Sequence, residues 1–300
     1  MNPTVVAFDR VSVRYGRTVA VDGVSFVVPR GCVYALLGRN GAGKSSLVRC
    51  LLGEQKPALG SVSVFGRPVW QTRVAAMARV GVVPEEPDIP PEMSAAATIA
   101  FCARLYPSWD GAGVERRLDR FGVPRTVPAG ALSKGQKGQL ALALALGPSP
   151  DLLVLDDPTL GLDAVARKEL YEELVEELAD RGTTVFLATH DLAGVEAVAD
   201  RVGALAGGRL LLDEDLEALK GRFRRVRLRS VGALPPELAR FGPYAMRRGA
   251  FADEAVLSRF DDGAFAEARD ALGIDPTDVS GMTMEEIFIA LHDPGDGRVP

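Results

Sequence analysis

The stretch GRNGAGKSS, residues 38–46, has the residue types and spacing of a phosphate-binding loop. Gly38, Gly43, Lys44 and Ser45 fit the pattern G-x-x-x-x-G-K-[ST], between an apolar strand-like segment and a helical pattern. The glycines let backbone N–H groups turn towards one anion, and the helix N-terminus adds partial positive charge. Lys44 would reach the phosphates and the Ser45 hydroxyl would ligate Mg²⁺. A plain glycine-rich turn is the alternative, but the flanking pattern favours a nucleotide-phosphate site.

Two adjacent carboxylates follow an apolar segment in LLVLDDPTLGLD, residues 152–163, where Leu152 to Leu155 run into Asp156 and Asp157. A carboxylate at a strand end beside a phosphate-binding loop completes the Mg²⁺ shell through water. The metal also makes two neighbouring negative charges tolerable. A pair of solvated acids is the other interpretation, and the four apolar residues before them disfavour it. We therefore predict that Asp156 belongs to the Mg²⁺ site.

The segments that must position these residues alternate between strand and helix patterns. Short runs rich in Val, Phe and Tyr predict strands at 5–8, 11–15, 24–28, 33–37, 61–65, 152–155 and 184–188. Apolar residues at helical spacing predict helices between about 98 and 146, and again over 164–179. Strands that alternate with helices indicate an α/β core with a parallel sheet.

The character of the chain changes near residue 216. The segment KGRFRRVRLRS, residues 220–230, is strongly basic, and its alternating apolar residues predict an edge strand with a solvated face. A short amphipathic helix is predicted for 284–291. We expect one large domain over 1–215 and a small accessory subdomain over 216–300.

Composition excludes several classes of protein. The net charge of −5 gives no reason to expect general nucleic-acid affinity. The three cysteines are widely separated, which favours a reducing compartment. The first residues turn polar too early for a signal peptide, and no apolar run approaches the roughly 20 residues that span a bilayer. We expect a cytosolic chain unless a membrane partner recruits it.

With these motifs in place, the sequence LSKGQ, residues 132–136, resembles the LSGGQ signature of the ATP-binding subunits of ABC transporters. The resemblance covers about residues 4–215. In that family two such domains dimerise head to tail, with ATP between the P-loop of one and the signature of the other. It implies that Ser133, Gly135 and Gln136 contact the ATP of a partner, in a homodimer or a heterodimer. Lys134, at the second glycine of the signature, is a departure that the family tolerates.

The same resemblance assigns further residues. Asn40, Gly41 and Ser46 complete the P-loop. Tyr15 matches the aromatic residue that stacks on adenine, although a lone tyrosine at a strand end is more often plain packing. Asp163 lies in LGLD, which looks like the D-loop that touches the opposing subunit, and His190 in FLATHD looks like the histidine that senses the γ-phosphate.

Two more departures concern catalysis. Glu85 stands where the family usually has a glutamine that contacts Mg²⁺ and the attacking water. Asp157 stands where a glutamate usually polarises that water, and its carboxylate is retracted by roughly 1.5 Å. We therefore predict hydrolysis that is present but slow. Two alternatives stay open: Asp157 acts through a second water, or the chain is the weak subunit of a heterodimer.

The resemblance implies a fold: a P-loop NTPase core with a parallel sheet, an N-terminal antiparallel β subdomain, a helical subdomain over about 87–145 that carries the signature, and a small C-terminal α+β appendage. The tail MTMEEIFIAL, residues 282–291, is similar to the ending of subunits from two-component exporters of drugs, bacteriocins and cell-envelope components.

The implied function is an ATPase that uses ATP and Mg²⁺ to drive export through separate transmembrane permease subunits. The chain would be cytoplasmic and peripheral on the inner face of the membrane. An ABC ATPase that acts on ribosomes or DNA, or that regulates a membrane partner, is the alternative. Only 88 positions separate Lys44 from Leu132, and one cassette is present, so ribosome and DNA arrangements do not fit. No nucleic-acid partner is expected, and neither the transported substrate nor the choice between homodimer and heterodimer can be read from the sequence.

Overall fold

The computed structural model describes residues 3–229, 235–247, 252–275 and 278–292. The chain forms two compact units, Met1–Asp213 and Glu214–Pro300. Within the described ranges, no helix is both long enough and apolar enough to cross a membrane.

The elements of the first unit are β1 (Thr4–Tyr15), β2 (Thr18–Pro29), β3 (Val33–Gly38), α1 (Lys44–Leu51), β4 (Leu59–Val64), β5 (Arg67–Pro68), α2 (Val69–Met77), β6 (Val80–Val83), α3 (Ala95–Leu105), α4 (Gly111–Arg120), η1 (Ala129–Ala131), α5 (Lys134–Leu146), β7 (Leu152–Asp156), α6 (Ala164–Arg181), β8 (Thr184–Thr189), α7 (Leu192–Val198), β9 (Arg201–Ala206) and β10 (Arg209–Asp215).

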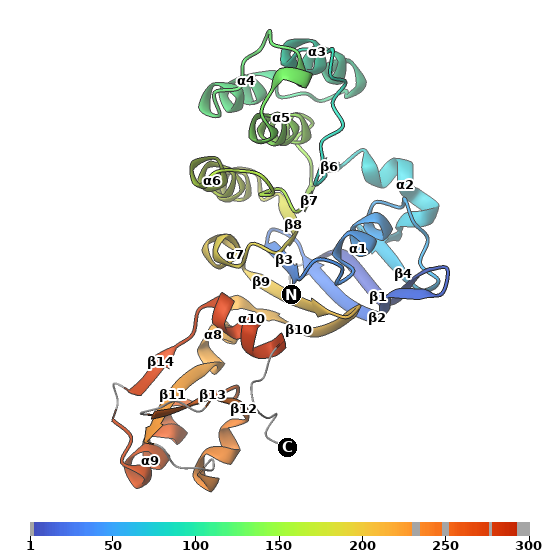
Figure 1. Cartoon of the computed structure of the whole chain (residues 1–300). Helices are drawn as coiled ribbons and strands as arrows, with labels where there is room; N and C mark the ends of the chain where they lie inside the picture. Colours follow the sequence, from blue (N-terminus) through green and yellow to red (C-terminus); the bar gives the residue numbers. More distant parts are fainter. Residues whose placement is uncertain (1–2, 230–234, 248–251, 276–277, 293–300) are drawn as a thin grey trace. The chain divides into compact units, whose positions relative to one another are not determined.

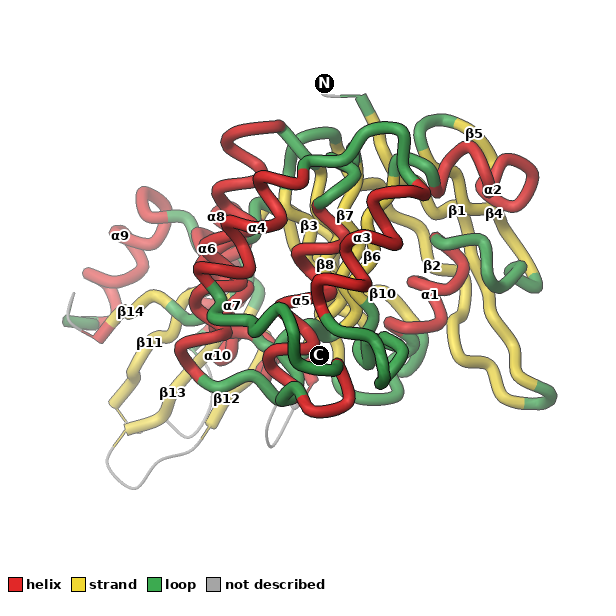
Figure 2. Tube along the Cα trace, turned by 90° about the horizontal axis from the view of Figure 1, so that it is seen from above, coloured by secondary structure: helices red, strands yellow, loops and turns green. Residues whose placement is uncertain are grey.

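The central sheet of the first unit has the strand order β10-β9-β3-β8-β7-β6. The neighbours from β9 to β6 pair in parallel, as the alternating pattern predicted. The two-residue link from β9 to β10 permits only an antiparallel pair, so the sheet is mixed. Every residue of β3 and β8 is buried because helices cover both faces: α1 lies on one, and α6 and α7 on the other (Figures 1 and 2).

A second sheet, with the order β2-β1-β4-β5, forms the N-terminal antiparallel subdomain. The two strands predicted at 5–8 and 11–15 are one strand, β1, with a shift of register between Phe8 and Val11. Arg10, with a φ of 48°, takes up this irregularity. Stacked rings join the two sheets: Phe26 of β2 stacks on Tyr34 of β3 with ring centroids 5.1 Å apart, and Phe8 of β1 stacks on Phe186 of β8 at 6.4 Å. The subdomain is therefore anchored on the core that carries the phosphate-binding loop.

Helices α3, α4 and α5 form the helical subdomain between β6 and β7. Helix α5 buries Leu140, Leu142 and Leu146 completely. It begins with a capping box, in which Gln136 N–H donates to the Ser133 hydroxyl oxygen and Ser133 N–H donates to the Gln136 side chain, both at 3.1 Å. The LSKGQ motif is thus the first turn of a buried helix, and the predicted fold class is confirmed for this unit.

The second unit is an antiparallel sheet with helices. Its elements are α8 (Leu216–Arg222), β11 (Arg224–Arg229), η2 (Pro236–Phe241), β12 (Pro243–Arg247), β13 (Ala252–Leu257), α9 (Asp262–Leu272), β14 (Val279–Gly281) and α10 (Met284–His292). The sheet order is β12-β13-β11-β14. Val226 and Leu228 of β11 pack in one apolar core with Phe241 and Phe265. The predicted terminal helix is present as α10.

The prediction that residues 220–230 contain an edge strand is wrong, because β11 lies between β13 and β14. The arginine side chains of β11 form ion pairs and are not only solvated. Arg225 donates to a Glu286 carboxylate oxygen at 2.6 Å, and Arg227 lies 3.4 Å from Glu254. Acidic partners from other segments neutralise the strand, which permits an interior position.

Candidate nucleotide-binding site

The loop between β3 and α1 depends on glycine at two positions. Gly41 and Gly43 have φ values of 80° and 109°, in a region that side chains with a Cβ rarely enter. A Cβ at position 43 would also lie 2.6 Å from the backbone oxygen of Ala20. The loop therefore brings its backbone close to a neighbouring segment, and α1 begins at Lys44 directly after it.

Lys44 is held at the base of this loop. Its ammonium donates to the Gly38 carbonyl oxygen at 2.9 Å and lies 3.3 Å from a carboxylate oxygen of Asp157. The side chains of Lys44 and Asp157 are only 5% and 9% exposed. A buried cation at the N-terminus of α1 provides a fixed positive charge for an anion bound in the loop.

Ser45 and Asp156 provide oxygen ligands suited to Mg²⁺. The Ser45 hydroxyl donates to Asp156 Oδ1 at 3.3 Å. Burial raises the pKa of Asp156, and the negative charges of Asp157 and Glu85 raise it further, while the Ser45 hydrogen bond and Lys44 oppose this shift. The described residues contain no group of three or more His, Cys, Asp or Glu side chains that could hold a metal alone. Mg²⁺ is usually bound through one or two carboxylates together with phosphate and water oxygens.

Asp157 follows β7 and is hydrogen-bonded to residues at the end of the neighbouring strand β8. Its φ of 45° is left-handed, and its N–H donates to the Ala188 carbonyl oxygen in β8 at 2.7 Å. Asp157 Oδ1 accepts the backbone N–H of His190 at 3.0 Å and lies 2.7 Å from His190 Nδ1. The carboxylate thus touches the imidazole with one oxygen and faces Lys44 with the other. Sequence reasoning placed Asp157 and His190 in one site but did not predict this contact.

One group of predicted residues surrounds a hollow of about 420 Å³, which we call the phosphate hollow. Its lining consists of Ala20, Arg39, Asn40, Gly41, Ala42, Gly43, Lys44, Ser45, Ser46, Glu85 and Asp157. Ala20, Arg39 and Ala42 were not predicted, although Arg39 and Ala42 lie inside the loop motif. Gly38, Asp156 and His190 do not line the hollow, and each is hydrogen-bonded to a lining residue.

Tyr15 lies beside this hollow. Its hydroxyl donates to the Gln55 side-chain oxygen at 2.6 Å and lies 3.3 Å from the Ser46 hydroxyl. The residue is 44% exposed, so part of its ring remains open to solvent. Gln55 positions this ring, and no motif in the sequence points to Gln55.

The other predicted residues line a second hollow of about 480 Å³, which we call the signature hollow. Ser133, Gly135 and Gln136 come from the start of α5, and Asp163 from the start of α6. Asp163 caps α6 by accepting the N–H of Ala166 at 2.9 Å. The two hollows share no lining residue. One chain therefore brings the predicted residues together in two separate groups.

The class of protein follows from this geometry. A parallel sheet, a glycine-rich loop that leads into a helix, a buried lysine and a strand-end aspartate beside the loop define a P-loop NTPase. The family model described as "ABC transporter" matches residues 21–160.

The curated relatives narrow the class further. The bacitracin transport ATP-binding protein BcrA of Bacillus licheniformis is 32% identical over 225 residues, which cover 74% of this chain and 73% of the relative. A Nod factor export ATP-binding protein I of Bradyrhizobium diazoefficiens is 38% identical over 232 residues, which cover 73% and 74%. The chain belongs to the ABC transporter family and contains its ATP-binding domain. It falls in the branch that includes these exporter subunits.

Solved structures agree with this assignment. An ATP-binding subunit of an ABC transporter is 29% identical, with a TM-score of 0.66 over 73% of this chain and 93% of that chain. A bacterial ABC transporter cassette solved as a dimer has a TM-score of 0.63 at 21% identity, covering 70% and 98%, and supports the fold alone.

Proposed function

We propose that the chain binds Mg²⁺ and ATP, pairs with a second cassette when ATP is bound, and hydrolyses ATP to drive export through separate transmembrane subunits. The observation that carries this proposal is the division of the predicted nucleotide residues between two hollows. The phosphate hollow supplies the buried Lys44, with Ser45 and Glu85 for the metal, and the signature hollow supplies the N-terminus of α5. A second cassette, identical or different, would bring its signature hollow to this nucleotide.

The residues that line the phosphate hollow, together with Asp156 and His190 that contact them, would divide the work of phosphoryl transfer. The loop N–H groups and Lys44 bind and orient the phosphates. Ser45, Asp156 and Glu85 would hold Mg²⁺, which when bound neutralises phosphate charge. Asp157 orients the attacking water, and His190, positioned by Asp157, contacts the γ-phosphate. Because catalysis here rests mostly on positioning and charge, small displacements of these groups should change the rate strongly.

Replacing Asp156 with asparagine should weaken Mg²⁺ binding in the presence of nucleotide by about 10- to 100-fold, as expected for an outer-shell metal partner. The shape is kept and the charge is lost. In the unmodified protein, Mg²⁺ affinity should also fall on acidification at a higher pH than for an exposed carboxylate, since burial raises the pKa of Asp156. Titration with Mn²⁺, followed by electron paramagnetic resonance, measures both effects. Asp119→Asn, which changes a 73% exposed carboxylate of α4, is the matched control, and equal affinity in the two variants would contradict the assignment.

A negative charge at Gly135 should prevent ATP-dependent dimerisation. A Cβ there would meet Leu162 Cδ2 at 3.4 Å, an ordinary contact, so Gly135→Asp should fold. The new carboxylate would face the γ-phosphate of the partner and weaken dimerisation by about tenfold or more, as like charges at an interface cost several kcal/mol. Light scattering with Mg²⁺ and ATP measures dimers, and nucleotide binding by the single chain should stay unchanged. Gly138→Asp, outside the signature hollow, is the control; dimers of Gly135→Asp that match it would overturn the head-to-tail arrangement.

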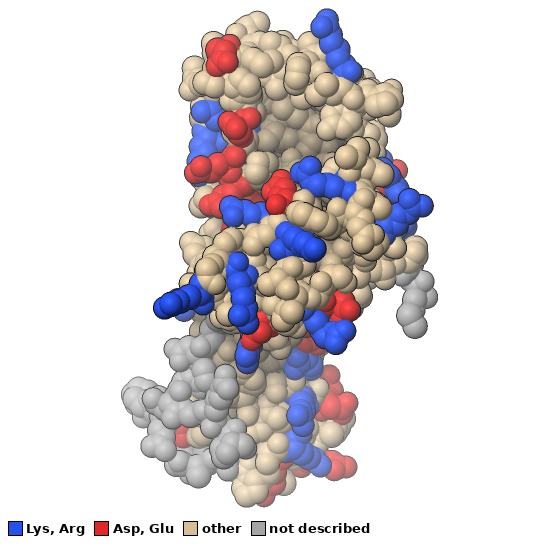
Figure 3. All heavy atoms as spheres, turned by 90° about the vertical axis from the view of Figure 1, so that its right-hand side faces the viewer, with Lys and Arg blue, Asp and Glu red and all other residues tan. Residues whose placement is uncertain are grey.

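A third hollow suits the transmembrane partner. It measures about 840 Å³, and Glu85, Glu86, Asp88, Cys102 and Tyr106 are among its lining residues. On α3 nearby, Phe101 and Leu105 are 56% and 61% exposed. The surface over the helical subdomain is largely uncharged on the face drawn in Figure 3. We propose that a permease segment docks here. Ser45 and Glu85 line both this hollow and the phosphate hollow, and Asp156 lines this one as well, so these residues would link the two.

The proposed arrangement makes residues 1–215 the cassette and residues 216–300 an accessory subdomain. It places the chain in the cytoplasm, on the inner face of the membrane through the permease. Purification from membranes should recover a multi-span protein with the chain. ATP-dependent co-sedimentation with ribosomes, without such a protein, would favour a non-transport ABC ATPase instead.

A further inference from the structure

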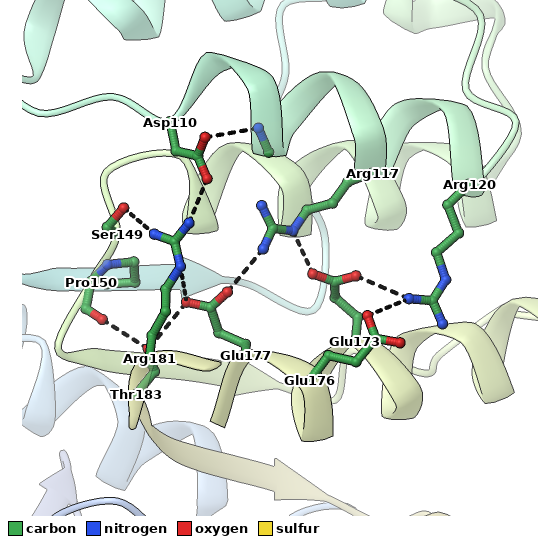
Figure 4. Close-up of polar contacts among 11 residues, drawn as sticks. Asp110, Arg117, Arg120, Ser149, Pro150, Glu173, Glu176, Glu177, Arg181 and Thr183 are labelled. Carbon is green, nitrogen blue, oxygen red and sulfur yellow. Dashed lines mark hydrogen bonds and ion pairs between the residues drawn. The ribbon is translucent and has the colours of Figure 1, made fainter. Parts of the chain in front are cut away.

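Helix α4 of the helical subdomain lies on α6 through charged side chains (Figure 4). Arg117 Nε donates to Glu173 at 2.5 Å, and Arg117 Nη2 donates to Glu177 at 2.8 Å. Arg120, one turn further along α4, donates to Glu176 at 2.7 Å. One face of α4 thus contacts successive turns of α6 through what we call the α4–α6 ion cluster.

The centre of the cluster is buried. The side chains of Arg117, Glu173 and Glu177 are 10%, 6% and 2% exposed. Burial raises the pKa of Glu177, and the charges of Arg181 and Arg117 oppose the shift. Apolar residues of similar volume usually give equal or greater stability than a buried ion cluster. A planar guanidinium that binds two carboxylates instead fixes direction and spacing.

Arg181, the last residue of α6, extends the cluster to two further segments. It donates to Asp110 at 2.5 Å and to the Ser149 hydroxyl, and its Nε lies 3.6 Å from Glu177. Asp110 caps α4 by accepting the N–H of Gly113 at 2.8 Å. The cluster therefore attaches the start and the end of α4, together with the turn before β7, to one helix.

The two helices that the cluster connects are each linked to one side of the signature hollow. Helix α4 packs on α5, which begins after Ser133, and α6 begins after Asp163. These sides nearly touch, since a Cβ at Gly135 would lie 3.4 Å from Leu162 Cδ2. A slide of α4 along α6 would change the spacing between Ser133 and Asp163. None of the cluster residues lines the phosphate hollow.

We propose that Arg117, with Glu173 and Glu177, is a positioning residue that holds the signature turn and Asp163 at the spacing required by the nucleotide of a second cassette. This inference rests on the proposed function and adds a residue that no motif assigns. It separates two properties of the chain: ATP binding by one cassette does not depend on the cluster, whereas pairing of two cassettes does.

Two variants test this role in the full chain. Arg117→Lys keeps the charge and removes the fork, and the triple variant Arg117→Met, Glu173→Met, Glu177→Met replaces the three buried charged side chains with apolar ones. Both should bind ATP as single chains with unchanged affinity, while ATP-dependent dimerisation weakens by about tenfold, which corresponds to about 1.4 kcal/mol of lost contact between the cassettes. The triple variant should melt at or above the temperature of the unmodified protein. Arg125→Lys is the matched control, because Arg125 pairs only with Glu115 and Asp119 of the helical subdomain among the contacts described.

Dimerisation is measured by light scattering with Mg²⁺ and ATP, well below each melting temperature. If the triple variant dimerises like the unmodified protein, the cluster is packing alone and the inference is wrong. It is equally wrong if Arg117→Lys loses ATP binding and dimerisation together. If the unmodified protein binds ATP but never forms dimers with itself or a second cassette, the proposed function fails first, and the positioning role fails with it.

Discussion

Replacing Lys44 with alanine is expected to lower kcat/KM for ATP hydrolysis by about 10³-fold, the effect of removing a main electrostatic group in phosphoryl transfer. Lys44 supplies a cation at the base of the phosphate hollow, 2.9 Å from the Gly38 carbonyl oxygen and 3.3 Å from Asp157. Without it, the carboxylates of Asp156 and Asp157 would face the phosphates with their charge less balanced. Release of inorganic phosphate, with Mg²⁺ and ATP in excess, measures the loss.

Lys44→Ala should also lower the stability of the fold. Its inactivity could therefore come from unfolding or from loss of the lysine charge at the phosphates. Lys44→Ala leaves the Asp157 carboxylate, 9% exposed, without its lysine partner. Breaking a buried pair in this way costs about 3–5 kcal/mol and should lower the melting temperature. The double variant Lys44→Ala, Asp157→Asn removes the unpaired charge and should recover most of that temperature while hydrolysis stays lost. Asp157→Asn alone is the reference, because it already lowers turnover. Hydrolysis in the double variant equal to that of Asp157→Asn alone would show that Lys44 acts only through folding.

The phosphate-binding loop and its metal partner could be predicted because the information is local. GRNGAGKSS fixes the glycines, Lys44 and Ser45 within nine consecutive positions, and the loop takes up the left-handed geometry that Gly41 and Gly43 permit. Asp156 could be predicted for the same reason, since LLVL marks the strand that it ends. Parallel strands then bring their carboxyl ends to one edge of the sheet.

Contacts between distant segments could not be predicted in this way. The pair of Asp157 and His190 depends on β7 lying next to β8, which is a property of the strand order. Arg117 and Glu177 lie 60 positions apart, and each belongs to an ordinary charged helix face in the sequence. The alternation in β11 predicted a strand but could not predict its neighbours, because Glu254 and Glu286, which neutralise its arginines, come from later segments.

Replacing Asp157 with glutamate is expected to raise the turnover of ATP by about 10- to 100-fold, because a displacement near 1 Å in a catalytic group changes rates on that scale. The carboxylate of Asp157 is short, and both of its oxygens have protein partners, His190 at 2.7 Å and Lys44 at 3.3 Å. An extra methylene would carry the carboxylate beyond these partners, towards the position of the attacking water. Asp157→Asn should instead lower turnover below that of the unmodified protein.

The backbone conformation of Asp157 also predicts how the glutamate variant changes stability. Asp157 has a φ of 45°, a left-handed conformation that aspartate and asparagine tolerate better than glutamate. Asp157→Glu should therefore lower the free energy of unfolding by roughly 1 kcal/mol while it raises kcat. Asp157→Asn suits the backbone but loses the charge that Lys44 faces. If Asp157→Glu lowers stability and raises turnover, the aspartate stabilises the left-handed backbone at this turn, and its shorter side chain lowers the rate of hydrolysis.

Turnover at single sites distinguishes the remaining readings of Asp157. If Asp157→Glu leaves turnover unchanged or lower, the shortened carboxylate does not limit the rate, and action through a second water becomes the better account. If it raises turnover of the chain alone, the site is complete but slow. If the gain is seen only when a second, different cassette is added, the chain belongs to a heterodimer whose other subunit supplies the faster site. Rapid-quench measurement of the first turnover, with and without that cassette, separates these outcomes.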